Sequence, residues 1–172
     1  MKAAAKKFQK TLLGLPWKID YKIRVPVSID LDINAGRGPI SVVGVEGDVR
    51  LSAAESQTVL KLSGGVVAAT IAKGNVILSV SERSWRRGGA DIRVAFGEVT
   101  VELPAGFSAD IDAEILRSGQ IINTYGELEA REKPGITPQK MKARTGAGGA
   151  FFQFTVGDGI INITKQGAVS KQ

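Results

Sequence analysis

Hydrophobic and polar residues alternate along several stretches of this chain, most regularly on either side of a Pro104-Ala105-Gly106 segment. The apolar positions there are Val99, Val101 and Leu103, then Phe107, Ala109, Ile111, Ala113 and Ile115. A period of two places alternate side chains on opposite faces of an extended strand. Proline fixes φ and lacks an amide donor, and the following glycine accepts unusual backbone angles. Residues 97–115 therefore predict two half-buried strands joined by a sharp corner.

A longer alternation runs from Ile19 to Ile33. Its odd positions are all apolar: Ile19, Tyr21, Ile23, Val25, Val27, Ile29, Leu31 and Ile33. The even positions are charged or polar except for Pro26, which we expect on the outward face, where it marks a kink or an edge. The pattern predicts one strand with its odd side chains in the core.

Short runs similar to Gly-x-Ile-x-Val recur along the chain. They begin at Gly38, Gly47, Gly74, Gly97, Gly119 and Gly159. Many neighbouring runs are about ten or about twenty residues apart, which is typical of repeat folds. We predict an all-β fold, a β-solenoid in which each coil stacks on the previous one and stacking supplies the core. An antiparallel β-sandwich is the alternative, because strands at about 8–12-residue spacing fit it too.

Residues 1–15 predict the one helix of the chain. Ala4, Phe8, Leu12 and Leu15 form an apolar stripe at helical spacing, with lysines on the opposite side. Such a helix caps the open end of a β-structure or lies on a membrane surface. The residues expected to act in either role are Lys2, Lys6, Lys7, Phe8, Lys10, Leu12 and Leu15. We divide the chain into this helix (1–16), a β-helix domain (17–166) and a C-terminal tail (167–172).

Composition restricts the function. The chain has 172 residues with neither cysteine nor histidine, so it lacks thiolate chemistry, the usual neutral-pH acid and base, and the commonest metal ligand. We therefore expect no enzyme and no cofactor. A net charge of +6 favours an anionic membrane surface or an acidic glycan as partner. Nucleic acid is not expected, because acidic side chains share the outward faces. We expect neither a signal peptide nor a membrane-spanning helix.

Three groups of residues are candidate sites. Trp85, Arg86 and Arg87 lie in a polar loop, where a guanidinium pairs with anions and an exposed Trp ring offers a flat apolar surface. This loop is the candidate partner-binding site, and a solvated loop that binds no partner is the alternative. The carboxylates at Asp110, Asp112 and Glu114, like those at Asp30 and Asp32, are interpreted as solvated strand faces rather than catalytic pairs. The glycine-rich residues 146–149 predict a tight corner, and residues 131–144 a long loop.

The order of several of these segments is similar to that of a known family. Residues 97–113 follow G-x-V-x-V-x-L-P-x-G-F-x-x-D-I-D-A, and S-G-x-I-x-N, G-x-G-G and a closing T-V-G-D-G-I-I-N-I follow at 118–123, 146–149 and 155–163. This order resembles the toastrack family of adhesin-like bacterial β-helix domains, over roughly residues 25–165. Gly157 stands where that family usually has Asn.

The resemblance implies a single-stranded right-handed β-helix found in cell-envelope proteins, with no established catalytic residues. We therefore expect a scaffold in the bacterial cytoplasm or cell envelope that forms a homo-oligomer or binds another envelope protein. A polymer-forming, bactofilin-like protein and a protein that binds or acts on glycans are the alternatives.

Overall fold

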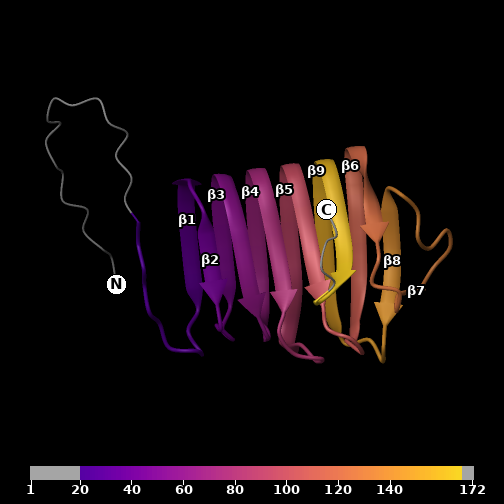
Figure 1. The fold of residues 1–172 in the computed structure, drawn as a ribbon, viewed down its shortest axis with the longest axis horizontal. Helices are drawn as coiled ribbons and strands as arrows, with labels where there is room; N and C mark the ends of the chain where they lie inside the picture. Colours follow the sequence, from indigo (N-terminus) through magenta and orange to yellow (C-terminus); the bar gives the residue numbers. More distant parts are fainter. Residues whose placement is uncertain (1–19, 168–172) are drawn as a thin grey trace, which may run out of the picture.

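The computed structural model describes residues 20–167, in which every regular element is a β-strand. The strands are β1 (Leu31–Arg37), β2 (Ile40–Val43), β3 (Val49–Leu62), β4 (Gly64–Val80), β5 (Arg86–Leu103), β6 (Ala109–Asn123), β7 (Glu129–Ala130), β8 (Lys140–Thr145) and β9 (Ala150–Lys165). They form one sheet in the order β1-β3-β4-β5-β9-β6-β8-β7, with β2 also on β3 (Figure 1). The helix predicted for residues 1–15 lies outside the described residues.

The long strands are parallel to their neighbours. The pairs β1–β3, β2–β3, β3–β4, β4–β5, β5–β9 and β6–β9 are all parallel. Within the described residues only β6–β8 and β7–β8 are antiparallel. The prediction of an all-β fold is confirmed. The antiparallel sandwich is wrong, because its neighbouring strands would run in opposite directions.

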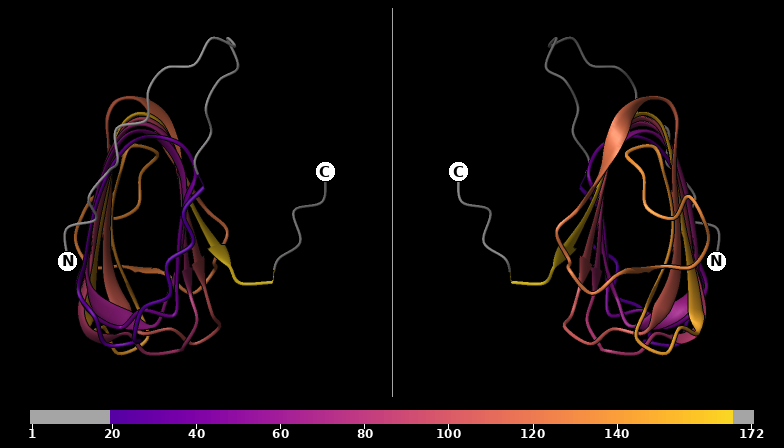
Figure 2. Two further views of the ribbon diagram at one scale, coloured as in Figure 1. Left: turned by 90° about the vertical axis from the view of Figure 1, so that its left-hand side faces the viewer. Right: turned by 90° about the vertical axis from the view of Figure 1, so that its right-hand side faces the viewer.

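A column of glycines marks the place where the long strands bend. Gly74, Gly97, Gly159 and Gly119 are successive register partners on β4, β5, β9 and β6. Their φ angles lie between 129° and 149°, which side chains rarely allow. Figure 2 shows the strands bending together, one behind the other. Four of the recurring sequence runs begin at these glycines, so the repeat in the sequence corresponds to a register in space.

The core lies inside these bent strands, and the alternation predicts its members. Val99, Val101 and Leu103 are fully buried on β5, and the apolar residues after the corner are buried as well. The corner itself is a turn at Ala105 and Gly106, as predicted. Phe107 stacks on Phe152 with ring centroids 5.6 Å apart. The aromatic side chains thus fill the space between β5, β6 and β9.

Strand β9 lies between β5 and β6, which the sequence did not predict. Gly159 is the register partner of both Gly97 on β5 and Gly119 on β6. The sequence leads one to expect each strand to stack on its predecessor, and β5 and β6 are joined by one short corner. The apolar alternation reports which face of β9 is buried, with Phe152 and Phe154 inward. The alternation does not indicate which strands pair with β9 on its two edges.

The strand predicted from Ile19 to Ile33 is wrong for most of its length. Residues 20–30 form no strand, and Tyr21 and Ile23 are 80% and 77% exposed. Pro26 donates no backbone hydrogen bond, and no further described strand lies beyond β1 to pair with this segment. Only Leu31 and Ile33, on β1, belong to the sheet. An amphipathic pattern forms a strand only where a neighbouring strand is present.

Candidate functional site

A ladder of opposite charges joins β6 to β8 on the outer face of the sheet. The antiparallel register places Asp110 opposite Arg144, Asp112 opposite Lys142, and Glu114 opposite Lys140. Arg144 Nε donates to Asp110 Oδ1 at 2.7 Å, and Lys140 Nζ lies 3.3 Å from Glu114 Oε1. A period of two on both strands, acidic on one and basic on the other, directs all six side chains to one face. The ladder therefore favours this register of the β6–β8 pair.

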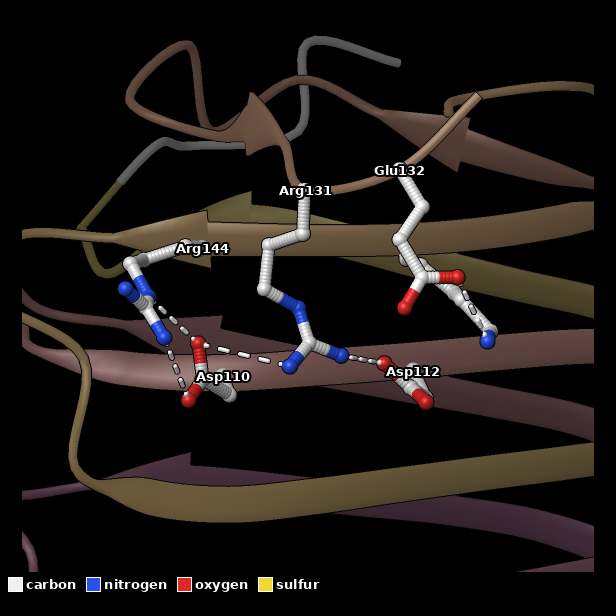
Figure 3. A network of polar contacts seen from close by, with 6 residues as sticks. Asp110, Asp112, Arg131, Glu132 and Arg144 are labelled. Carbon is white, nitrogen blue, oxygen red and sulfur yellow. Dashed lines mark hydrogen bonds and ion pairs between the residues drawn. The ribbon is translucent and has the colours of Figure 1, made fainter. Parts of the chain in front are cut away.

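Arg131 extends over the ladder from the segment that follows β7 (Figure 3). Its guanidinium contacts two of the three carboxylates of β6: Nη1 is 3.7 Å from Asp110 Oδ1, and Nη2 bonds to Asp112. The next residue, Glu132, accepts a 2.9 Å hydrogen bond from Lys142. The Arg131 side chain is only 23% exposed, and within residues 20–167 its Nε is the one buried side-chain nitrogen or oxygen without a hydrogen-bond partner. These contacts fasten the segment after β7 to the sheet.

The charged neighbours stabilise the ionised form of these acids. The hydrogen bond from Arg144 lowers the pKa of Asp110, against the opposing effect of desolvation. The hydrogen bond from Lys142 likewise lowers the pKa of Glu132. A general acid at neutral pH needs a raised pKa. The arrangement is suited to ion pairing. Asp110 and Glu132, whose pKa values are lowered, are ionised near neutral pH and have no proton to donate.

Two hollows on the described surface bear on the search for a ligand site. One of about 100 Å³ lies beside the ladder, between Glu114, Lys140 and Gln153. A larger groove of about 600 Å³ lies near the bend of β3 and β4, where Glu55, which forms an ion pair with Arg37, and Lys73 line it. Residues 20–167 contain no group of three acidic side chains arranged to hold a metal ion.

Trp85 is buried, and the expectation of an exposed ring is wrong. Its side chain is 8% exposed, its Nε1 donates to the Gly65 carbonyl at 2.8 Å, and its ring meets Phe152 edge-on at 5.1 Å. The polar residues around it suggest a solvated loop, but β5 begins at the next residue and directs the indole into the core. The ring is therefore unable to provide a flat surface for a partner.

Arg86 and Arg87 are exposed, as expected, and both are paired. Arg86 contacts Glu46 at 3.0 Å and Glu82 at 2.8 Å, and Arg87 contacts Asp48 at 3.1 Å. An anionic ligand here would have to displace acids of the chain itself. The two arginines thus join β5 to the segments before β3 and β5.

The structure also shows the positions of the remaining candidate residues within residues 20–167. Asp30 accepts a 2.8 Å hydrogen bond from the Asp48 amide, and Asp32 faces Arg50 in the register of β1 and β3. Residues 146–149 form the predicted corner before β9, with a turn at its start. The candidate cap or membrane residues between Lys2 and Leu15 lie outside the part of the chain that the structure describes.

Sequence reasoning missed the basic half of the ladder. Residues 131–144 were expected to form one long loop, whereas Lys140–Thr145 is strand β8. Arg144 and Asp110 are 34 residues apart, so nothing local connects them. One signal was present: Lys140, Lys142 and Arg144 repeat at period two, like the acids they meet.

Comparison with known proteins adds no further assignment. No family model, curated protein or solved structure matches the chain. In residues 20–167 there is no helix with the length and hydrophobicity needed to cross a membrane. The protein is all-β, with one mostly parallel sheet on which many of the outward charges are paired.

Proposed function

We propose that this chain is a non-enzymatic β-solenoid scaffold, a single-stranded right-handed β-helix that associates through the open end of its stack. The observation that carries the proposal is the contrast between the two ends of the sheet. At one end β8 pairs with residues 109–114 of β6 and β7 pairs with β8, whereas at the other β1 has no strand on its outer side within residues 20–167. An unpaired parallel edge is a surface on which another chain can pair.

Regular stacking supports the solenoid. Val49 on β3 is the register partner of Leu31 on β1 and of Val67 on β4, so register partners on these strands are 18 residues apart in the sequence. No single strand can bury its own apolar side, so each depends on its neighbours, as in repeat proteins. The resemblance to toastrack domains points the same way and suggests the bacterial cell envelope as the location.

The state of the charged groups supports a binding rather than a catalytic role. Asp110 and Asp112, the carboxylates that a glycan-cleaving enzyme would use, are paired with Arg131 and Arg144. Trp85 is buried, which leaves the glycan-binding alternative without its aromatic platform. A scaffold needs neither feature.

Light scattering of the intact chain at increasing concentration tests this proposal. We expect a molar mass that rises to a multiple of 18.2 kDa. We also expect the Asp110→Asn variant, assayed beside the wild type on a panel of acidic polysaccharides, to show the same absence of cleavage. A chain that stays at 18.2 kDa at every concentration, or cleavage that the variant loses, would contradict the proposal.

A further inference from the structure

A groove crosses β1, β3 and β4 at the point where the chain bends. Its volume is about 600 Å³, within the range of roughly 300–1,000 Å³ that is typical of ligand sites. It is lined by three consecutive residues from each of three neighbouring segments, 37–39, 55–57 and 73–75. Arg37, Glu55 and Lys73 are successive register partners. Gln57 and Asn75 are paired in the same way, so the groove runs across the strands with one row of side chains on each side.

The middle residue of each segment contributes only backbone to the floor of the groove. Gly38 and Gly74 have no side chain, and their φ angles of 133° and 137° lie in the region that favours glycine. Ser56 is 3% exposed, and its hydroxyl lies 3.0 Å from that of Thr58 in the interior. A ligand can therefore approach the bend more closely than outward side chains would allow.

Three exposed side chains of the groove are available to a ligand. Lys73, Gln57 and Asn75 form no hydrogen bond or ion pair within residues 20–167. The one acid of the groove, Glu55, is already paired with Arg37 at 3.4 Å. The lining thus holds two basic side chains and one acidic one, which leaves the Lys73 ammonium without an anion. The two amides each offer a donor and an acceptor.

The same two rows continue onto β5 and β9, where their members contact other side chains of the chain. Phe96, in the first row, lies beneath the Arg117 guanidinium, with Cζ 4.9 Å from the ring centroid. Arg117 also donates to Asp158 of that row at 2.7 Å. Glu98, in the second row, accepts a 3.1 Å hydrogen bond from Thr100. Across β3 and β4 no such contact links the rows within the described residues, so the polar groups of the groove stay open to solvent.

We propose that this groove binds an acidic glycan, a chain of sugars that carries carboxylate groups. The inference goes beyond the proposed scaffold function and holds whether or not the chain self-associates. A sugar carboxylate pairs with the Lys73 ammonium, and sugar hydroxyls exchange hydrogen bonds with the amides of Gln57 and Asn75. Binding here differs from that expected at Trp85, because one charge and several hydrogen bonds carry it and no aromatic ring lines the groove.

A peptide fits this groove less well than a glycan. Peptides that add to a sheet pair with the backbone of an edge strand. Strands β3 and β4 are interior, and their backbone groups pair with their neighbours. A ligand that crosses them must bind through side chains. Hydroxyl and carboxylate groups distributed along a glycan match the two amides and the ammonium.

Calorimetric titration with tetragalacturonate, an oligosaccharide with a carboxylate on every sugar, tests the role of charge. We expect the wild type to bind it and the Lys73→Gln variant to bind about tenfold more weakly, because a hydrogen bond to a charged group is lost. Lys61→Gln is the matched control. Lys61 is an exposed lysine of β3 outside the groove, so its replacement should leave the affinity unchanged. The neutral counterpart galactotetraose should bind the wild type about tenfold more weakly than tetragalacturonate does.

A second pair of variants tests the amides. Gln57→Ala removes one amide of the groove and should weaken tetragalacturonate binding about fivefold, the effect of one neutral hydrogen bond. Gln120→Ala is its control, because Gln120 is an exposed amide of the same register row on β6, outside the groove. Its affinity should equal that of the wild type. Both positions are exposed, and circular dichroism should show the wild-type fold in both variants.

Three results would overturn the glycan site. They are a wild type that does not bind tetragalacturonate, equal affinities of Lys73→Gln and Lys61→Gln, and tetraglutamate binding as tightly as tetragalacturonate. The last result would assign the groove to an acidic peptide.

Light scattering separates this inference from the proposed function. A monomer that binds tetragalacturonate would overturn the proposed association and support the groove. A multimer that does not bind it would overturn the groove and leave the association in place.

Discussion

Gly97 lies in the glycine column at a point where there is no space for a Cβ atom. An added Cβ would be 1.8 Å from the Gly74 carbonyl oxygen, and φ is 145°. Gly159 is in the same position against Gly97, at 1.7 Å. The column allows strand backbones to approach one another at the bend. Glycine is required at these positions because a Cβ atom would clash with the neighbouring backbone.

Replacing Gly97 by alanine should destabilise the fold by about 3 kcal/mol or more, because backbone strain and a backbone clash act together. Urea unfolding followed by circular dichroism measures the change. Gly36→Ala is the matched control. Gly36 has open space around its Cβ position and no positive φ, so its replacement should change stability by less than about 1 kcal/mol. Equal effects at the two positions would contradict the packed column.

Trp85 is a core residue in this structure, so its removal should affect folding. We expect Trp85→Ala to cost about 3–5 kcal/mol of unfolding free energy, through the cavity and the lost hydrogen bond to Gly65. Arg86→Ala, at the adjacent exposed position, should leave the free energy of unfolding close to the wild-type value. Chemical denaturation of both variants compares them directly. If Trp85→Ala left the free energy of unfolding unchanged, the result would contradict a buried Trp85 and support the exposed ring that the sequence suggested.

At the scale of elements, the ion pairs between β6 and β8 should make the covered end of the sheet sensitive to acid. Asp110 has a pKa held below its usual 3.8 by the hydrogen bond from Arg144. A carboxylate of this kind contributes its full stability above the ordinary pKa and loses it as pH falls through the lower value in the folded state. Stability should therefore fall as the pH is taken below about 4.

The Asp110→Asn variant should separate this contribution from the rest. At neutral pH it should be less stable than the wild type by about 1–3 kcal/mol, since Arg144 and Arg131 lose a charged partner. Below the pKa of Asp110 the two proteins should converge. Thermal unfolding at a series of pH values follows both effects. A difference that stays constant from neutral to acidic pH would contradict an ionised Asp110.

The elements also show where sequence reasoning succeeds. The alternation around Pro104 and Gly106 gave both strands, their buried faces and the corner, because each depends on local geometry. Strand β8 was missed because its charges are meaningful only opposite Asp110, Asp112 and Glu114, far away in the sequence. The strand prediction for residues 20–30 was wrong for the opposite reason. Their alternation is regular, but no described strand lies beside them to pair with. In each case pairing, which is non-local, decided the outcome.

At the scale of the whole molecule, the position of β9 determines which edges remain open. With β9 between β5 and β6, β8 pairs with the first part of β6 at one end, and within residues 20–167 no strand lies on the outer side of β1 at the other. The interior register repeats, as the recurring glycines indicated, but the order of the strands does not follow the chain. The proposed scaffold depends on this order.

An engineered disulfide between β5 and β9 tests the order most directly. Thr100 and Asn162 are register partners, so a chain with cysteine at both positions should form an internal disulfide, lost on reduction. Cysteines at Thr100 and Ile122 should not bond, because β9 lies between them. Peptide mapping of the oxidised proteins reads out both. The account predicts a 100–162 bond and no 100–122 bond, and the reverse result would contradict it, since it would place β6 directly on β5.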